Sequence, residues 1–215
     1  MTVFLTGSNG YMGQRLIPLL VERGHNVRAL VRAGSEKKLP GGCAPIVGDA
    51  LDAASYAARV APADTFVHLV GVPRPNPWKG AQFRAVDLPS IRAAVSVARS
   101  ARVQHFVYLS VAHPAPIMKD YIAVRTEGER LLRESAMNAT FLRPWYVLGP
   151  GHYWPYLLAP SYFFFELFPP TRASAQRLGL VTLAQMLAAL VAAVESPPSG
   201  IRIVDVPQIR SAVRK

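Results

Sequence analysis

The first chemistry that the residues suggest is the binding of a diphosphate by backbone amides. Three glycines recur in Thr6-Gly7-Ser8-Asn9-Gly10-Tyr11-Met12-Gly13, between an apolar run and a helical pattern. Gly7 permits a tight turn, Gly10 lets the backbone approach a pyrophosphate, and Gly13 lets a helix pack closely on a strand. Free N–H groups at the start of that helix would face the diphosphate charge. The spacing predicts a dinucleotide site over residues 7–13; an ordinary glycine turn is the alternative.

A cation stands where the dinucleotide's ribose is expected. NAD sites usually have an acidic residue about twenty residues beyond the glycine turn, at the end of the second strand, where it holds the 2′-hydroxyl. This chain has Arg32 there, with Arg28, Lys37 and Lys38 nearby. A guanidinium can bind a 2′-phosphate through two parallel hydrogen bonds. We therefore expect NADP(H) rather than NAD(H); solvated charges on a basic surface are the alternative.

The elements that must position these residues alternate along the chain. Short apolar and β-branched runs predict strands over 2–6, 26–31, 45–47, 65–70, 104–110, 139–143 and 201–206. A 3.6-residue apolar period predicts helices over 11–23, 53–60, 82–101, 117–135 and 182–194, with a kink at Pro18. The alternation predicts an α/β fold: a doubly wound parallel Rossmann sheet with helices on both faces and a reduced C-terminal segment. Ligands are then expected at the carboxyl ends of the strands.

Length and composition indicate one folded domain. The 215 residues, 51% hydrophobic and 17% charged, suffice for one buried core. We expect residues 1–151 to form the cofactor-binding core and residues 152–215 a small substrate or lid segment with the last helix and strand. The amino terminus shows no basic leader or membrane-spanning run, so the cytoplasm is the expected compartment. A single Cys43 and scattered histidines predict no disulfide and no metal site.

The net charge of +11, with a pI of about 10.3, is a second feature that bears on partners. Such a charge is typical of proteins that bind nucleic acid or anionic membranes. The basic residues are dispersed, and neither a helix-turn-helix nor an RNA-binding aromatic motif occurs, so nucleic acid is not expected as a partner.

An aromatic, proline-punctuated segment runs from Tyr153 to Phe168. Packing against the sheet, a lid over the cofactor, a dimer surface and a membrane-surface patch are its four interpretations.

Further motifs carry a family resemblance. They are the glycine turn, Val27–Arg32, Gly48-Asp49, Tyr121-x-x-x-Arg125 and residues 142–151. In this order they resemble the atypical and extended short-chain dehydrogenase/reductases, especially the NAD(P)H-binding, nitrogen-repressor-like and NAD-dependent epimerase/dehydratase-like members. The resemblance covers about residues 2–151. It implies that Asp49 and Ala50 lie beside the adenine, Val70 and Gly71 beside the ribose, and Pro144 near the nicotinamide; a capping role for Asp49 is compatible with this.

The resemblance also implies a catalytic group. In this family a Ser or Thr after the fifth strand polarises a carbonyl, a Tyr transfers a proton, and a Lys four residues later holds the ribose. Ser110 and Tyr121 match the first two places, and Arg125 stands at the third. Residues 121 and 125 share a helix face, where a fixed positive charge favours the ionised phenol. Arg for Lys is nevertheless not a conservative exchange at a tightly fitted site.

Two functions follow from these residues. The resemblance implies an NADPH-dependent oxidoreductase or epimerase-like enzyme that acts on a small carbonyl or hydroxyl substrate. A non-catalytic NADPH-binding redox sensor or accessory subunit is the alternative, and Tyr121 and Ser110 would then be structural. The resemblance further implies a homodimer formed through the helices over 82–101 and 117–135.

Overall fold

The fold is a three-layer α/β/α sandwich around a parallel sheet. The computed structural model describes residues 1–151 and 169–214. Within these residues the sheet has the order β3-β2-β1-β4-β5-β6-β9, and every neighbouring pair is parallel. Its strands are β1 (Thr2–Thr6), β2 (Asn26–Val31), β3 (Ala44–Val47), β4 (Thr65–His68), β5 (His105–Leu109), β6 (Asn138–Arg143) and β9 (Ile201–Asp205). A separate short pair joins β7 (Tyr146–Leu148) to β8 (Leu180–Thr182).

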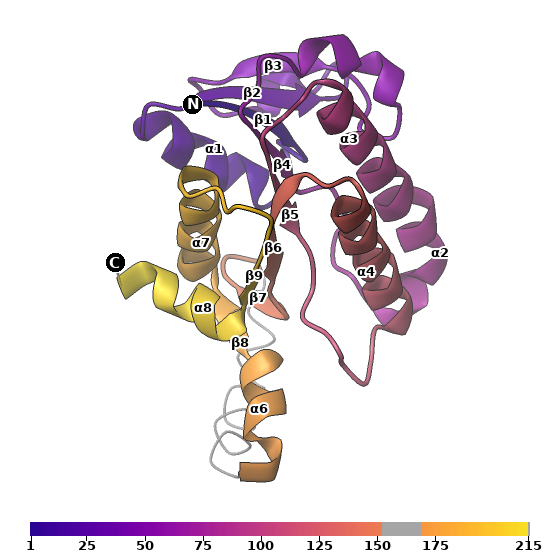
Figure 1. Cartoon of the computed structure of the whole chain (residues 1–215), viewed down its shortest axis with the longest axis vertical. Helices are drawn as coiled ribbons and strands as arrows, with labels where there is room; N and C mark the ends of the chain where they lie inside the picture. Colours follow the sequence, from indigo (N-terminus) through magenta and orange to yellow (C-terminus); the bar gives the residue numbers. More distant parts are fainter. Residues whose placement is uncertain (152–168, 215) are drawn as a thin grey trace.

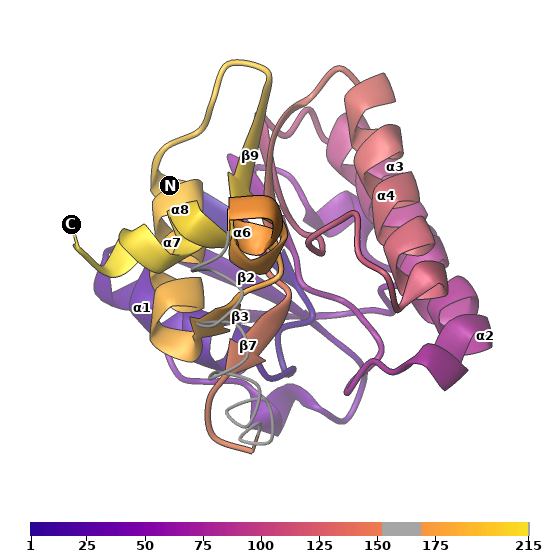
Figure 2. The ribbon, with the colours of Figure 1, turned by 90° about the horizontal axis from the view of Figure 1, so that it is seen from below.

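Helices cover both faces of the sheet (Figure 1). One face carries α1 (Gly13–Glu22), α7 (Leu183–Glu195) and α8 (Val206–Ser211), and the other carries α2 (Gly80–Gln82), α3 (Leu88–Ser100) and α4 (Lys119–Glu134). The helix α6 (Pro169–Arg177) lies beyond the lower edge of the sheet, and the view from below shows it in front of the strands (Figure 2). The predicted doubly wound Rossmann sheet is therefore confirmed.

Each face of the sheet has its own apolar core. The first core packs α1 and α7 on the sheet through residues such as Leu16, Leu20 and Leu190, all fully buried. The second core holds Phe4, Phe66 and Phe106 from three adjacent strands, and the rings of Phe66 and Phe106 stack with centroids 5.0 Å apart. Strands buried on both faces explain why the sequence shows continuous apolar runs rather than alternation.

The strand order reverses direction between β1 and β4. The chain moves outward from β1 to β3, then returns to place β4 on the other side of β1. Loops that leave β1 and β4 at their carboxyl ends lead to helices on opposite faces of the sheet, and the glycine turn leaves β1 at this switch point.

The predicted helix over 53–60 is wrong. Residues Ala53–Ser55 and Ala57–Arg59 form two separate 3₁₀ turns. The Asp52 carboxylate accepts the N–H of Ala54, and the Ser55 hydroxyl bonds the carbonyls of Asp49 and Asp52. Local side-chain bonds of this kind compete with the helical ladder.

Other elements agree with the predictions to within a few residues. The strand β4 ends at His68, before the predicted Val70, and the predicted helix over 82–101 contains a π-helical turn at Phe83–Asp87. The helix α7 begins after Thr182, which forms a capping box with Gln185. The short strands β7 and β8 were not predicted. The aromatic segment lies outside the described residues. Among the helices that are described, none is long and apolar enough to cross a membrane.

Two buried histidines make the stability of this sheet depend on pH. His68 is 1% exposed and bonds Thr6 through Nδ1 at 2.8 Å, with the Ser90 hydroxyl 3.4 Å from Nε2. Burial, with a smaller contribution from Arg125, lowers the pKa of His68 to about 3. Burial, helped by Arg202, also lowers the pKa of His105 to about 4. Both imidazoles are therefore neutral in the folded protein.

We expect the free energy of unfolding to fall as the pH drops from 7 to 5. In this window the unfolded chain protonates its histidines near pH 6.5 while folded His68 stays neutral, so His68 alone accounts for a loss of about 2 kcal/mol. Urea denaturation at several pH values measures the slope. In His68→Gln the free energy of unfolding should fall less steeply with pH, because the contribution of His68, about 2 kcal/mol between pH 7 and 5, is removed. An unchanged slope would show that His68 takes up its proton in the folded state.

Candidate functional site

The glycine turn is built so that backbone, not side chains, lines the start of α1. Gly7 has φ +77°, and a Cβ there would lie 2.7 Å from the carbonyl carbon of Leu69. A Cβ on Gly13 would lie 2.4 Å from the carbonyl oxygen of Gly7, so only glycine lets the helix begin this close to the strand. The hydroxyl of Ser8 turns inward and donates to the Leu5 carbonyl at 2.8 Å.

The first turn of α1 has no side-chain cap. Its N-cap residue, Met12, makes no side-chain hydrogen bond to the helix; the N–H groups of Gln14 and Arg15 bond the carbonyls of Gly10 and Met12. Gly10 is exposed and Asn9 is half-buried, so the turn is open on its outer side. The exposed Gly10 and the start of α1 beside it fit an anionic ligand, because the helix dipole favours negative charge there. The residues present thus fit a dinucleotide diphosphate.

Tyr11 links the turn to the C-terminal half of the chain. Its hydroxyl lies so near Gly149 that a Cβ on that glycine would be 2.4 Å from it. The guanidinium of Arg15 lies 4.2 Å from the centre of the Tyr11 ring and donates to the Tyr11 carbonyl. The loop after β7 therefore packs against the glycine turn through Gly149 and Tyr11.

Basic residues gather beyond the end of β2, as predicted, but Arg28 is not among them. Arg32 and Lys37 are both exposed, and Gln14 of α1 donates to the Lys38 carbonyl at 3.1 Å, which holds this basic segment against the glycine turn. Arg28 lies within β2 and donates to the Ala61 carbonyl at 2.6 Å, just ahead of β4. The grouping of Arg28 with a 2′-phosphate was therefore wrong, since its side chain reaches toward the amino ends of the strands.

The predicted adenine residues lie after β3. Asp49 is exposed and accepts the N–H of Leu51 at 3.0 Å, so its carboxylate closes a local turn. Ala50 beside it is half-buried and packs against the second core. The amide of Gly48 bonds the Val31 carbonyl, so this loop sits beside the end of β2 and its basic segment.

The structure brings Tyr121 and Arg125 together with the loop after β4. The Arg125 guanidinium lies 5.1 Å from the centre of the Tyr121 ring, as expected for residues one turn apart. Its Nη2 donates to the Val70 carbonyl at 3.3 Å, and a Cβ on Gly71 would lie 2.3 Å from the same nitrogen. A Cβ on Gly7 would lie 3.0 Å from the Val70 nitrogen, so the backbone of the glycine turn lies close to Val70. The glycine turn, the β4 loop and the Tyr–Arg pair therefore form one continuous group.

Arg125 is held inside the protein by three acceptors. Besides Val70, it bonds the Leu109 carbonyl at 2.9 Å and the Asp87 carboxylate at 2.8 Å, and its side chain is 5% exposed. Asp87 also accepts the N–H of Val72 at 3.0 Å. The Nε atom of Arg125 is buried without a hydrogen-bond partner among the described residues. A ligand atom could therefore bond Nε, while both terminal nitrogens are engaged.

Electrostatics keep this group charged. Burial alone would lower the pKa of Arg125, but Tyr121, Tyr108 and Asp87 raise it. Burial raises the pKa of Asp87, although Arg125 and the Val72 N–H act in the opposite direction. We regard the pair as ionic at neutral pH because two donors reach the carboxylate. Burial also raises the pKa of Tyr108 to about 12, so this second phenol beside Arg125 stays protonated.

Ser110 lies at the end of β5 with its hydroxyl turned to a different partner. It is 2% exposed and donates to Glu129 Oε1 at 2.7 Å. Glu129 also accepts two bonds from Arg143. Burial would raise the pKa of Glu129, but the bonds from Arg143 and Ser110 outweigh it and lower the pKa. Pro144 is buried next to this cluster, and its carbonyl accepts the N–H of Ala112. Ser110 directly follows Leu109, whose carbonyl bonds Arg125, but the Ser110 hydroxyl donates to Glu129 instead.

Asp87 and Glu129 were missed at the sequence level, although a signal was present. Asp87 is in phase with Ile91, Ala94 and Ala98, which are among the buried residues of α3. Glu129 continues the four-residue spacing of Tyr121 and Arg125 along α4. A charge on the buried face of a helix requires a partner, and that requirement could have singled out both residues.

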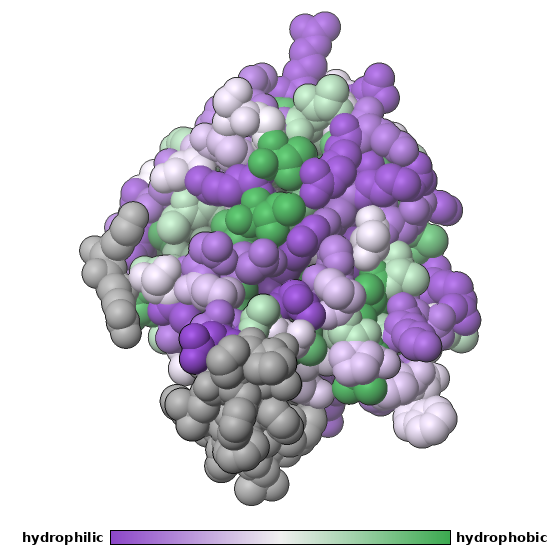
Figure 3. All heavy atoms as spheres, turned by 60° about the horizontal axis from the view of Figure 1, so that its bottom comes forward, coloured by the Kyte–Doolittle hydropathy of each residue, from purple (hydrophilic) through white to green (hydrophobic). Residues whose placement is uncertain are grey.

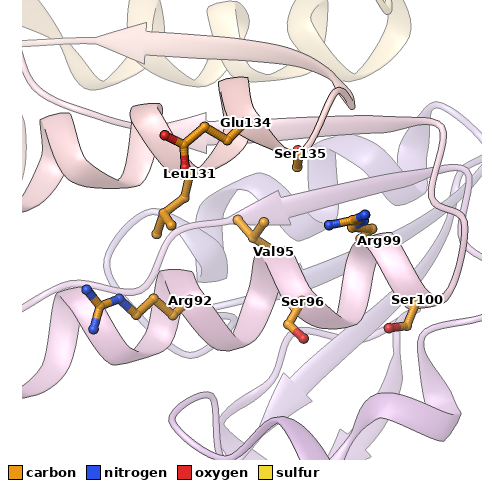
Figure 4. Close-up of a pocket in the computed structure, with 8 residues that line it drawn as sticks. All are labelled: Arg92, Val95, Ser96, Arg99, Ser100, Leu131, Glu134 and Ser135. Carbon is orange, nitrogen blue, oxygen red and sulfur yellow. The ribbon is translucent and has the colours of Figure 1, made fainter.

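A surface groove lies elsewhere, between the outer sides of α3 and α4 (Figure 4). Its lining is mixed in charge and comprises Arg92, Val95, Ser96, Arg99, Ser100, Leu131, Glu134 and Ser135. None of these residues belongs to the glycine turn or the Tyr–Arg group, so the groove is separate from the candidate site. No group of three or more metal-binding side chains occurs in the described part of the chain.

Known proteins are similar in sequence to this chain. Residues 7–151 match the family model described as NAD(P)H-binding. A ceramide reductase of Caulobacter vibrioides is 28% identical over 162 residues, which cover 69% of this chain and 47% of the relative. The 4-hydroxy-2-methyl-3-oxo-4-farnesyl-3,4-dihydroquinoline-1-oxide ketoreductase of Stigmatella aurantiaca is 26% identical over 171 residues, 69% of this chain and 51% of the relative. The chain thus spans about half the length of these relatives.

A solved structure shows the same fold. The Bordetella bronchiseptica enzyme WbmH, in complex with NAD+, superposes with a TM-score of 0.70 and 21% identity, over 95% of this chain and 75% of that one.

The buried pair gives a testable energetic prediction. We expect Asp87→Leu to lower the free energy of unfolding by about 3–5 kcal/mol, because the Arg125 charge is left buried without its carboxylate. The double variant Asp87→Leu/Arg125→Met removes both charges and should recover much of that loss. Urea denaturation of both single variants and the double variant measures the coupling. Additive losses would mean that the two charges do not stabilise each other.

Proposed function

Because this chain belongs to the NAD(P)H-binding family, we propose that it is an NADPH-dependent oxidoreductase or epimerase-like enzyme that acts on a carbonyl or hydroxyl substrate. The observation that carries the proposal is the continuous contact from the uncapped glycine turn through Val70 to Arg125 and Tyr121. Both reactive parts, a dinucleotide cradle and a phenol beside a cation, lie at the carboxyl end of the sheet.

The chain's own residues would hold the cofactor at four places. The turn over residues 7–13 receives the diphosphate, Arg32 and Lys37 the 2′-phosphate, Asp49 and Ala50 the adenine, and Val70, Gly71 and Pro144 the nicotinamide half. Exposure of Arg32 and Lys37 next to the start of α1 supports NADPH over NADH.

Proton transfer falls to Tyr121 in this proposal. When bound, NADPH supplies a hydride to the substrate carbonyl carbon. Tyr121 donates its phenolic proton to the carbonyl oxygen, with the guanidinium of Arg125 beside its ring. The buried Nε of Arg125 is the donor left to hold a ribose hydroxyl. Ser110 is the proposed carbonyl-polarising residue and would have to release Glu129 to act.

The relatives' names indicate a substrate class. A ceramide and a farnesyl-substituted quinoline oxide are both lipophilic, and both names describe reduction. We extend this to the present chain and propose a lipophilic ketone or alcohol as its substrate.

A non-catalytic NADPH-binding sensor or accessory subunit is the second candidate. It is favoured by the engagement of both Arg125 terminal nitrogens and of the Ser110 hydroxyl within the protein. For either function we propose that the protein is located in the cytoplasm. Residues 1–151 would form the cofactor-binding core and residues 152–215 the substrate or lid segment. Two copies would form a homodimer through α3 and α4.

Replacement of the basic residues beyond β2 should remove the cofactor preference. In Arg32→Ser/Lys37→Ser we expect the Kd for NADPH to rise about 10- to 100-fold, since charge-assisted bonds to the 2′-phosphate contribute about 1.5–3 kcal/mol. The Kd for NADH should stay the same, as measured by calorimetry. Arg28→Ser is the matched control, because its side chain bonds Ala61 instead. An unaltered NADPH-to-NADH ratio in the double variant would refute this site for the 2′-phosphate.

Substitution of the proposed proton donor separates the two functions. Tyr121→Phe should lower the turnover of NADPH with lipophilic ketones by about 100-fold or more while the Kd for NADPH holds steady. Tyr56→Phe, a buried tyrosine in the second core, is the control and should keep full activity. If wild-type protein binds NADPH tightly but oxidises it with no carbonyl compound, the sensor function stands and the enzyme proposal falls.

A further inference from the structure

Two loops at the carboxyl end of the sheet present large apolar side chains to solvent. Trp78, in the loop over residues 71–80, is 92% exposed, which is the highest value for any large apolar side chain in the described residues. Ile117, in the loop over residues 111–119, is 49% exposed. Exposure of a tryptophan to this degree costs free energy in water unless a partner covers it.

The first loop is organised around the exposed tryptophan. Asn76 accepts the N–H of Trp78 at 3.1 Å, and Lys79 donates to the Pro73 carbonyl at 2.7 Å. Prolines at positions 73, 75 and 77 restrict the backbone further. The loop is thus closed on itself with the indole outside, and little ordering remains to be done when the indole meets a partner.

The two loops are neighbours. Asp120, at the start of α4, lies so close to Gly80 that a Cβ there would be 2.1 Å from its carboxylate. The same carboxylate accepts from Arg84 at 3.0 Å. These contacts join the end of the first loop to the end of the second, beside α2 and the lower end of α4 in Figures 1 and 2. Figure 3 looks onto this end of the molecule, where hydrophilic and apolar side chains are interspersed.

The two loops that carry the apolar side chains also carry positive charge. Arg74, Lys79 and Lys119 lie in the two loops, and neither 71–80 nor 111–119 contains an Asp or a Glu. The nearest acid, Asp120, is already paired with Arg84. The net charge of the chain, +11, adds a long-range attraction to anionic surfaces.

We propose that these loops, residues 71–80 and 111–119, dock on the surface of an anionic lipid bilayer. Tryptophan suits the headgroup level of a membrane because its ring is amphipathic, and Ile117 adds apolar area beside it. Arg74, Lys79 and Lys119 meet the negative surface potential of the lipid. This combination of apolar tips within a cationic rim is the pattern of interfacial binding.

The docking surface lies beside the proposed proton donor. Tyr121 follows Lys119 by two residues and packs on Phe83, with ring centroids 4.9 Å apart. A lipophilic substrate dissolved in the bilayer would therefore reach the site from the docked side. This consequence rests on the proposed function, whereas the docking itself does not.

Co-sedimentation of the full chain with vesicles tests the proposal. We expect binding to vesicles of phosphatidylcholine with phosphatidylglycerol, weakening at high salt, and no binding to phosphatidylcholine alone. Arg74→Glu/Lys79→Glu should weaken the partition by more than about tenfold, since each basic residue near the surface contributes about fivefold. Trp78→Ser/Ile117→Ser should weaken it to a similar extent without changing the net charge.

Controls separate this surface from the general positive charge. Arg59→Glu/Arg102→Glu changes the net charge equally but at the amino ends of β4 and β5, and Val213→Ser removes an exposed apolar side chain elsewhere; both should bind vesicles nearly as wild type does. Equal losses in control and loop variants, equal binding to neutral vesicles, or no sedimentation at all would overturn the proposal. Calorimetry with NADPH on the same variants keeps the two questions apart, because a docking failure leaves the dinucleotide Kd unchanged.

Discussion

The buried guanidinium of Arg125 is the constraint around which the carboxyl end of the sheet is organised. A charge this deeply buried is tolerated only when bonded on several sides. Here the bonds come from the ends of β4 and β5 and from the π-helical turn before α3, through Val70, Leu109 and Asp87. Removal of any one would leave the charge short of partners. The Val70 end of this group also lies against the glycine turn, because a Cβ on Gly7 would be 3.0 Å from the Val70 nitrogen.

That scaffold explains two local irregularities. The π-helical turn at Phe83–Asp87 places Asp87 toward Arg125 instead of continuing a regular helix, as such turns often do near functional sites. The strand β4 ends at His68, and the next residues bend away so that the carbonyl of Val70 reaches the guanidinium. In both places a regular element gives way to the requirements of one charge. The cost is local, and the benefit is a fixed position for the Tyr121 ring over the cation.

Much of the fold could be predicted from the sequence because its signals are local. Continuous apolar runs mark strands buried on both faces, and the glycine spacing marks the turn after β1. The site was less accessible because its contacts are distant in sequence. Arg125 and Asp87 are 38 residues apart, and Ser110 and Glu129 are 19 apart. Side-chain direction was equally hidden: Arg28 and Arg32 are four residues apart in the sequence, yet Arg28 bonds the Ala61 carbonyl near the amino end of β4. Short 3₁₀ turns replaced a predicted helix because Asp52 and Ser55 bond their own backbone.

Electrostatic polarity connects these features. Arg32 and Lys37 are exposed beyond the end of β2, beside the first turn of α1, and Arg125 is a buried charge paired with Asp87. Arg74, Lys79 and Lys119 extend the same sign onto neighbouring loops. In the two proposals the ligands, a dinucleotide and an anionic bilayer, are both polyanions, so each is attracted by positive charge. The surfaces proposed to receive them differ in shape: the glycine turn presents backbone beside the exposed Gly10, whereas the Trp78 side chain protrudes and is 92% exposed. Local backbone geometry, rather than charge alone, therefore distinguishes the two proposed ligands.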